Sequence, residues 1–152
     1  MLVLKPPAPL AIPPTTRVVF LAGSIEMGAA EDWQTKLTAL LDGELIVLNP
    51  RRDEWDASWR QSIQEPKFRE QVEWELDGLD RADVIAMWFA AETRSPITLL
   101  ELGLHARGGK LIIGCPPGFW RRGNIEVVSA RYGISLHATW DAFSTAVLTA
   151  CA

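Results

Sequence analysis

Residues 83–114 read DVIAMWFAAETRSPITLLELGLHARGGKLIIG, and this stretch decides the fold. Two apolar runs, DVIAMWF and KLIIG, flank a segment whose apolar residues recur at helical spacing. Ser95 followed by Pro96 is typical of a helix start, and the glycine pair that follows shortly after His105 is typical of a helix end. A strand, a helix and another apolar strand in this order predict two parallel strands joined by a crossover helix.

The same alternation extends outward in both directions along the chain. The predicted strands are 17–22, 44–48, 83–89, 110–114 and 134–136. The predicted helices are 30–41, 67–81, 96–105, 124–131 and 139–148. Continuous apolar strands that are each followed by a helix predict a parallel sheet covered on both faces. We therefore expect residues 17–152 to form a flavodoxin-like three-layer αβα sandwich with a five-stranded parallel sheet, and its ligand to bind at the carboxyl ends of the strands.

Residues 1–16 differ from the rest because five prolines interrupt an apolar segment, MLVLKPPAPLAIPP. Proline prevents a continuous helix, and no apolar run approaches the roughly 20 residues of a membrane span. We expect an extended arm that is disordered or lies on a neighbouring molecule, and no membrane partner.

The composition excludes several classes of protein. The chain has 152 residues, 48% hydrophobic and 22% charged, and a net charge of −4, which gives no strong attraction to nucleic acid. Two cysteines are too few for a disulfide framework or a zinc site, and they favour a reducing, cytoplasmic compartment. Seven tryptophans are unusual at this length, and we expect some of them to line a pocket.

Common cofactor and nucleophile motifs are absent from the sequence. There is no phosphate-binding P-loop, no dinucleotide-binding glycine fingerprint and no G-x-S-x-G elbow. The two histidines, His105 and His137, lack metal-ligand spacing, and we expect them at the surface or at helix ends. The sequence thus predicts neither a metal nor a cofactor.

Glu101 is the unusual residue of the apolar helix 96–105. Acidic residues are almost never fully buried unpaired, so one interpretation is an ion pair with Arg51 or Arg94. The other is a functional carboxylate that points into a cleft. Glu75, beside Trp74 and the apolar stripe of helix 67–81, is a candidate proton donor with a raised pKa, whereas the other acids of that helix are expected on a solvated face.

The loop after the second strand, NPRRDEWDASW, combines tryptophans with Asn49, Arg51 and Arg52. Aromatic faces together with amide and carboxylate groups suit a planar heteroaromatic ligand. An Asx turn with a surface cluster of ion pairs explains the same residues equally well.

Five ordered segments, VFLAGSIEMG, NPRRDEWD, QVEWEL, SPITLLELGLHARGGK and GFWRRGN, closely resemble the nucleoside 2-deoxyribosyltransferase-like family. The resemblance implies a flavodoxin-like homo-oligomer whose active site is completed by a neighbouring subunit. It also implies that Glu101, in LLELG, attacks the anomeric carbon of a 2′-deoxyribonucleoside. A deoxyribosyl ester forms on this residue, and a second nucleobase replaces the first with retention, as in a retaining glycosidase.

The resemblance assigns further roles residue by residue. Glu75 matches the acid that handles the base, although relatives often have Asp there. The turn Ala22–Gly23–Ser24 matches the glycine-containing turn that holds the substrate. Asn124 resembles the neighbour-subunit asparagine that contacts the sugar 5′-hydroxyl. Asn49 and Arg51 lie where the base edge or loop closure is expected.

Ser95 departs from the pattern, because many transferases have Asp six residues before the nucleophile. Related hydrolases of deoxynucleoside 5′-monophosphates place a serine there to hold phosphate. The sequence therefore predicts a cofactor-free deoxyribosyltransferase acting on 2′-deoxynucleosides and free nucleobases. A 5′-monophosphate N-glycosidase is the first alternative, and a non-catalytic nucleotide-binding module is the second.

Overall fold

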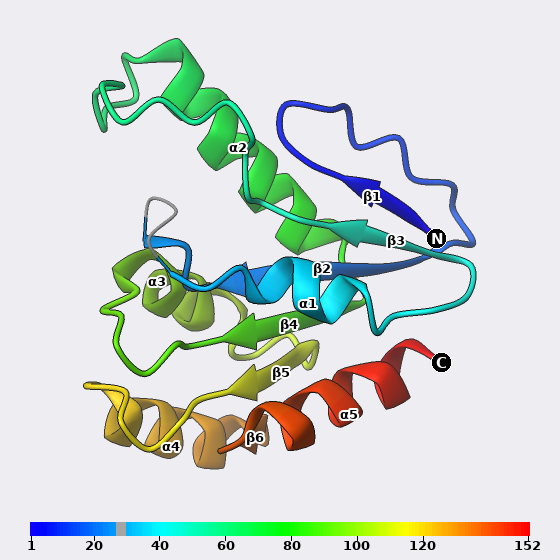
Figure 1. Cartoon of the computed structure of the whole chain (residues 1–152), viewed down its shortest axis with the longest axis vertical. Coiled ribbons are helices and arrows are strands. Elements are labelled where there is room, and N and C mark those ends of the chain that lie inside the picture. Colours follow the sequence, from blue (N-terminus) through cyan, green and yellow to red (C-terminus); the bar gives the residue numbers. More distant parts are fainter. Residues whose placement is uncertain (27–29) are drawn as a thin grey trace.

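The computed structural model describes residues 1–26 and 30–152, and these form a six-stranded sheet with helices on both faces (Figure 1). The strands are β1 (Leu2–Leu4), β2 (Arg17–Gly23), β3 (Leu45–Leu48), β4 (Val84–Trp88), β5 (Leu111–Gly114) and β6 (Ser135–His137). The helices are α1 (Trp33–Thr38), α2 (Pro66–Arg81), α3 (Pro96–His105), α4 (Arg122–Tyr132) and α5 (Trp140–Cys151). Between the first predicted strand and helix, the sequence predicts a loop over residues 23–28; the structure describes it as far as Glu26, and its last two residues lie outside the described residues.

The sheet is parallel throughout, with the strand order β1-β3-β2-β4-β5-β6. The arrowheads of β2, β4 and β5 all point to the left in Figure 1. The chain passes from β2 to β3 on one side, and then crosses to β4 on the other side of β2. The strand order therefore reverses between β2 and β4, and the carboxyl ends of these two strands border the switch point where α/β proteins bind ligands. The predicted flavodoxin-like sandwich is confirmed.

Alternate side chains of each strand face opposite helical layers. Phe20 and Ala22 of β2 belong to a buried cluster that includes Trp74 of α2 and Leu102 of α3. The intervening Leu21 belongs to a second cluster, formed with α1 and α5. This period of two residues puts α2, α3 and α4 on one face of the sheet and α1 and α5 on the other.

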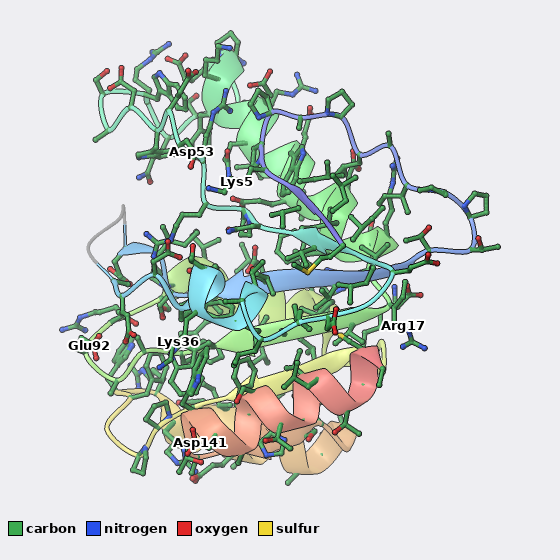
Figure 2. The ribbon with its side chains drawn as sticks, turned by 45° about the vertical axis from the view of Figure 1, so that its right-hand side comes forward. Lys5, Arg17, Lys36, Asp53, Glu92 and Asp141 are labelled. Carbon is green, nitrogen blue, oxygen red and sulfur yellow. The ribbon has the colours of Figure 1, made fainter. Side chains whose placement is uncertain are left out.

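The prediction of five strands was wrong by one, because the start of the expected arm is a sixth strand. Leu2–Leu4 pairs in parallel with β3 at the edge of the sheet. Further along the arm, Lys5 forms an ion pair with Asp53 at 2.6 Å (Figure 2), and the indole N–H of Trp74 donates to the carbonyl of Ala8 at 2.8 Å. The arm therefore lies on its own domain. The prolines begin only after Lys5, so every residue of the strand keeps the N–H that pairing requires.

Two helices begin two or more residues away from the predicted position, whereas α2 and α5 begin within one residue of it. α1 is shorter than the expected 30–41, because the Asp32 carboxylate caps it by accepting from the backbone N–H of Thr35 at 3.1 Å. α4 begins at Arg122, two residues before Asn124. Across residues 1–26 and 30–152, no helix combines the length and apolar character needed to cross a bilayer.

Helix α2 packs closely against the sheet at Gly78. A Cβ added there would lie 2.8 Å from Cε2 of Phe20 and 3.3 Å from Cδ1 of Leu48, so the glycine allows the helix to approach β2 and β3. Gly123 of α4, by contrast, has no neighbouring heavy atom within 4 Å of such a Cβ.

Gly78→Ala is expected to lower the free energy of unfolding by about 1–2 kcal/mol. Overpacking costs about 1–3 kcal/mol, and the better helix propensity of alanine offsets at most about 1 kcal/mol of it. Urea denaturation followed by tryptophan fluorescence measures this change. Gly123→Ala is the matched control, and it should leave the stability unchanged or slightly raised. Equal stabilities for the Gly78 variant and wild type would show that α2 does not depend on this close approach.

Candidate active site

The loops after β2 and β4 are joined at the switch point by Ser24. Its backbone N–H donates to the carbonyl of Trp88 at 3.0 Å, and its hydroxyl oxygen accepts from the N–H of Ala90 at 3.0 Å. The preceding Gly23 has a φ of +146°, and an added Cβ would lie 2.8 Å from the ring of Trp33. The glycine and the serine of the predicted turn thus bring the two carboxyl ends together.

Three buried hydroxyl groups gather beside this junction. Ser24 Oγ lies 2.8 Å from Thr93 Oγ1 and 2.5 Å from Ser95 Oγ, and Thr93 and Ser95 are 2.8 Å apart. Ser95 occupies the expected N-cap position of α3, but its hydroxyl makes no capping hydrogen bond. The hydroxyl is turned into the cluster instead, and the residue has a left-handed φ of 46°. The prediction of a serine cap was therefore right in position and wrong in role.

Glu101 is buried on α3, with 8% of its surface exposed. None of the ion pairs among the described residues includes it, so the interpretation of a pair with Arg51 or Arg94 was wrong. Burial raises the pKa of Glu101 to about 8, and repulsion from Glu75 adds to the increase. The buried Thr98 lies one helical turn before it, on the same face of α3.

Glu75 comes from α2, on the same face of the sheet, and is partly buried. Burial raises its pKa to about 7, although Gln71 opposes the increase by donating to Glu75 Oε1 at 2.6 Å. The Gln71 amide also donates to the carbonyl of Pro50 at 3.0 Å, which fixes the amide against the loop after β3. The prediction of a raised pKa for Glu75 is confirmed.

Two neighbouring acids with raised pKa values titrate as a pair. Ionising both Glu75 and Glu101 would place two negative charges close together in a poorly solvated region. Near neutral pH the pair therefore retains a proton, which belongs to the pair rather than to one residue. One ionised and one protonated carboxyl group is the combination that serves a nucleophile and a general acid.

The residues predicted to bind substrate in the loop after β3 make contacts within the protein. Asn49 is buried, and its Oδ1 accepts from the N–H of Arg51 at 3.0 Å, as in an Asx turn. The guanidinium of Arg51 donates to the Gln34 side chain at 3.3 Å and to the carbonyl of Ala30 at 3.2 Å. Arg52 pairs with Glu70 at 2.9 Å. These contacts match the Asx-turn and ion-pair alternative, and a role in substrate binding for Asn49 and Arg51 stays a prediction.

Asn124 is an exposed residue of α4. It lines a groove of about 320 Å³ between α3 and α4, together with Leu99, Leu102 and Tyr132. Outside this groove, α3 and α4 also expose large apolar side chains, which are Ile97, Leu100, Leu104 and Val127. The apolar sequence of helix 96–105 predicts a helix that is buried on most sides, and this prediction is wrong for the single chain.

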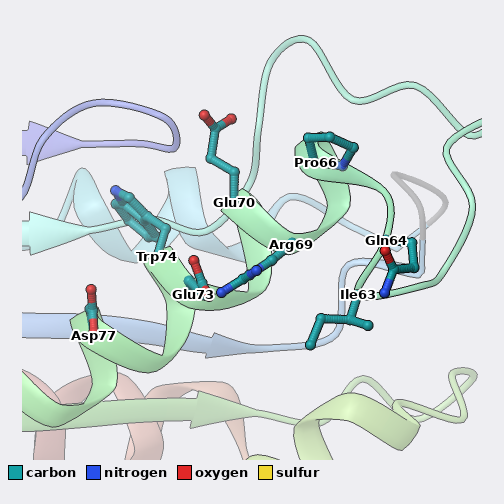
Figure 3. A pocket seen from close by; sticks show the side chains of 8 residues that line it. All are labelled: Ile63, Gln64, Pro66, Arg69, Glu70, Glu73, Trp74 and Asp77. Carbon is teal, nitrogen blue, oxygen red and sulfur yellow. Dashed lines mark hydrogen bonds and ion pairs between the residues drawn. The ribbon is translucent and has the colours of Figure 1, made fainter.

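A larger groove, of about 550 Å³, runs along the outer side of α2 (Figure 3). Three acidic side chains, Glu70, Glu73 and Asp77, line it together with Arg69 and Trp74. Neither Glu75 nor Glu101 lines it, so the two acids with raised pKa values lie outside this larger groove.

Several polar residues of the site were missed from the sequence. Thr93 and Thr98 carry no motif, and Gln71 was part of the quoted QVEWEL segment without a role of its own. The signal that was available is spacing, because Gln71 precedes Glu75 by one helical turn, as Thr98 precedes Glu101. Among the residues of the two described ranges, no three histidine, cysteine or acidic side chains form a group suited to a metal ion.

The fold is a parallel α/β sandwich, and two of its acids, Glu75 and Glu101, have raised pKa values on one face of the sheet. The sequence profile of the nucleoside 2-deoxyribosyltransferase-like family matches residues 16–119, more than half of the chain, and the chain belongs to this family. The match contains Glu75, Ser95 and Glu101 and ends before Asn124. The curated proteins contain no sequence that matches the chain.

Glu101→Gln is expected to stabilise the protein at alkaline pH. The pKa of Glu101 is about 8 in the folded protein against an ordinary value of 4.5. The stability that its bound proton contributes is complete below the lower value and is lost as the pH rises through the higher one. Glutamine needs no proton, so the midpoint of thermal unfolding should equal that of wild type near pH 5 and exceed it by about 3–8 °C near pH 9.

Glu73→Gln is the matched control, because the Glu73 side chain lies on α2 and is 55% exposed. Its melting temperature should follow that of wild type at both pH values. A Glu101→Gln variant that shows no pH-dependent gain would mean that the carboxyl group is not desolvated.

Proposed function

We propose that the protein is a cofactor-free nucleoside 2-deoxyribosyltransferase that exchanges nucleobases between 2′-deoxyribonucleosides. The observation that carries the proposal is the pair formed by Glu101 and Glu75, two carboxyl groups with raised pKa values that form no ion pair with any side chain the structure describes. Membership of the nucleoside 2-deoxyribosyltransferase-like family supports the choice of substrate.

The proposed reaction starts from the form of the pair in which Glu75 holds the shared proton and Glu101 is ionised. In its first half, the Glu101 carboxylate attacks the anomeric carbon of the deoxynucleoside. The bond between this carbon and the base nitrogen breaks, and its electron pair goes to the base. Glu75 delivers its proton to the departing base as general acid. An ester between deoxyribose and Glu101 results, and the charge on the pair is unchanged because one carboxylate has been esterified and one acid has been ionised.

In the second half, the nitrogen of an incoming base attacks the anomeric carbon of the ester, and Glu75 accepts the proton of that nitrogen. Glu101 leaves as a carboxylate, so the pair returns to its starting state. Two displacements at one carbon retain its configuration. The turn at Gly23 and Ser24, with the hydroxyl of Ser95, is proposed to hold the sugar, whereas Asn49 and Arg51 position the loop next to the base.

Hydrolysis of deoxynucleoside 5′-monophosphates is the alternative that a specific observation favours. Ser95 presents a hydroxyl at the beginning of α3, where a phosphate group is well placed. The same carboxyl pair would then release the base, and water would take the place of the second base.

We also propose that two copies of the chain pack through the apolar surface of α3 and α4. This surface is defined by Ile97, Leu100, Leu104 and Val127. Large apolar side chains left exposed on one chain favour a protein interface. Asn124 lies in this groove and would thereby reach the sugar bound in the partner.

Glu101→Ala is expected to abolish base exchange, with a loss of roughly a thousandfold or more, because no other carboxylate is placed to attack. The assay incubates deoxyinosine with adenine and measures deoxyadenosine by chromatography. Wild type treated with deoxyinosine alone should carry one deoxyribosyl group on the peptide that contains Glu101, detected by mass spectrometry.

Glu73→Ala is the control, because it removes an exposed carboxyl group from α2, and it should leave exchange unchanged. Activity of the Glu101 variant within about tenfold of wild type would refute the nucleophile assignment. Release of free base from deoxyinosine monophosphate, without any exchange, would establish the hydrolase instead.

Leu100→Asp is expected to convert the oligomer into monomers and to lower exchange activity strongly. Leu100 is 60% exposed in the single chain, and a charge at a desolvated interface is costly. Ile63→Asp is the matched control, because Ile63 is 69% exposed but lies outside this surface. Analytical ultracentrifugation with parallel activity assays tests both variants. A wild-type protein that is monomeric and fully active would contradict the proposal.

A further inference from the structure

The side chain of Glu26 lies at the beginning of α3. Its Oε1 accepts a hydrogen bond at 2.8 Å from the backbone N–H of Ser95, the residue directly before the helix. A carboxylate in this position is stabilised by the positive end of the helix dipole. The chain therefore supplies an anion of its own at the place where the hydrolase alternative requires the phosphate of a substrate.

Glu26 and the hydroxyl cluster form one corner of the site. Ser95 provides the N–H that binds Glu26 and also the hydroxyl that lies 2.5 Å from Ser24, which is two residues before Glu26 in the chain. Glu26 and Ser95 both have a φ of 46°, a left-handed conformation that non-glycine residues rarely adopt. Both residues therefore have an unfavourable backbone conformation at the point where they form their hydrogen bond.

We orient the substrate with its base toward Glu75 and its 5′ end toward the beginning of α3, and this step rests on the proposed function. Ser95 is six residues before Glu101, or about 9 Å along the axis of α3. A sugar attacked by Glu101 has its base toward Glu75 on α2. Its 5′ end then extends toward the beginning of α3, where Glu26 and Ser95 lie.

The arginines that could attract a phosphate are bonded elsewhere. Arg51 donates to the carbonyl of Ala30, and Arg52 pairs with Glu70. The guanidinium of Arg94 lies over the ring of Trp120, 4.8 Å from its centre. Glu26 accepts a hydrogen bond from the backbone of the hydroxyl cluster. Within residues 1–26 and 30–152, no cationic side chain is bonded to the backbone of this cluster.

From these contacts we infer that Glu26 determines substrate specificity by selecting free deoxynucleosides and rejecting their 5′-monophosphates. A carboxylate accepts a hydrogen bond from the 5′-hydroxyl of a nucleoside. A phosphate ester has lost this hydroxyl and brings negative charge toward the carboxylate, so the same group repels it. Glu26 thereby favours the transferase substrate over the hydrolase substrate at one end of the shared site.

The inference is tested by equilibrium binding to Glu101→Gln protein, which keeps the site but lacks the nucleophile. Isothermal titration measures the Kd of deoxyinosine and that of deoxyinosine 5′-monophosphate. We expect the nucleoside to bind at least about tenfold more tightly, and Glu26→Gln in the same protein to reduce the ratio by about tenfold, because glutamine keeps the acceptor for the Ser95 N–H and removes the charge.

Glu92→Gln is the control for a general change in charge. Glu92 is exposed in the loop after β4 and should alter the ratio by less than about twofold. Glu26→Asp keeps the charge and should preserve the discrimination.

Three results would overturn the inference: a ratio that Glu26→Gln does not change, a monophosphate that binds as tightly as the nucleoside, or no binding of either ligand. The proposed function is tested separately by base exchange in the wild type. Exchange without a Glu26-dependent ratio would remove the specificity role alone. A Glu26-dependent ratio without exchange would remove the transferase proposal alone.

Discussion

Two carboxyl groups lie near each other inside this protein, and neither forms an ion pair within residues 1–26 and 30–152. Burial and mutual repulsion raise the pKa of Glu101 and burial raises that of Glu75. An arginine at this place would ionise both acids and leave no proton for the reaction. The helices that carry them, α2 and α3, lie on one face of the sheet and are anchored by buried apolar residues, among them Trp74 and Leu102. The apolar core thus offsets the cost of keeping the pair poorly solvated.

The carboxyl edge of the sheet uses its polar groups in two different ways. Ser24, Thr93 and Ser95 direct their hydroxyls toward each other at the switch point, where a ligand of an α/β sandwich is expected. Arg51 instead directs its guanidinium to backbone carbonyls and holds the loop after β3 against the segment before α1. A guanidinium has five donors in a fixed plane, so it suits the joining of loops as well as the binding of anions. Residue type alone does not separate these two uses.

The apolar surface of α3 and α4 connects the site to the proposed assembly. The same helix that buries Glu101 and Thr98 on one side exposes Ile97, Leu100 and Leu104 on the other. A helix with apolar side chains on both sides needs a packing surface on each side, and in the single chain the sheet covers only one of them. A second copy of the chain is the partner that we propose for the other side. Assembly would then hold α3, and with it Glu101, from both sides.

The sequence by itself determined the alternation of strands and helices, because apolar periodicity and the Ser-Pro and Gly-Gly boundaries are local signals. It also singled out Glu101 and Glu75, since a carboxyl group within or beside an apolar stripe is visible in the sequence. Only the tertiary structure decided that Leu2–Leu4 joins the sheet, because three residues have too little periodicity to indicate a strand. The tertiary structure also decided three sets of contacts: the hydroxyl cluster, the hydrogen bond between Glu26 and Ser95, and the hydrogen bonds of Arg51. These depend on distances between residues far apart in the chain, and such distances are set by the packing of whole elements rather than by any local pattern.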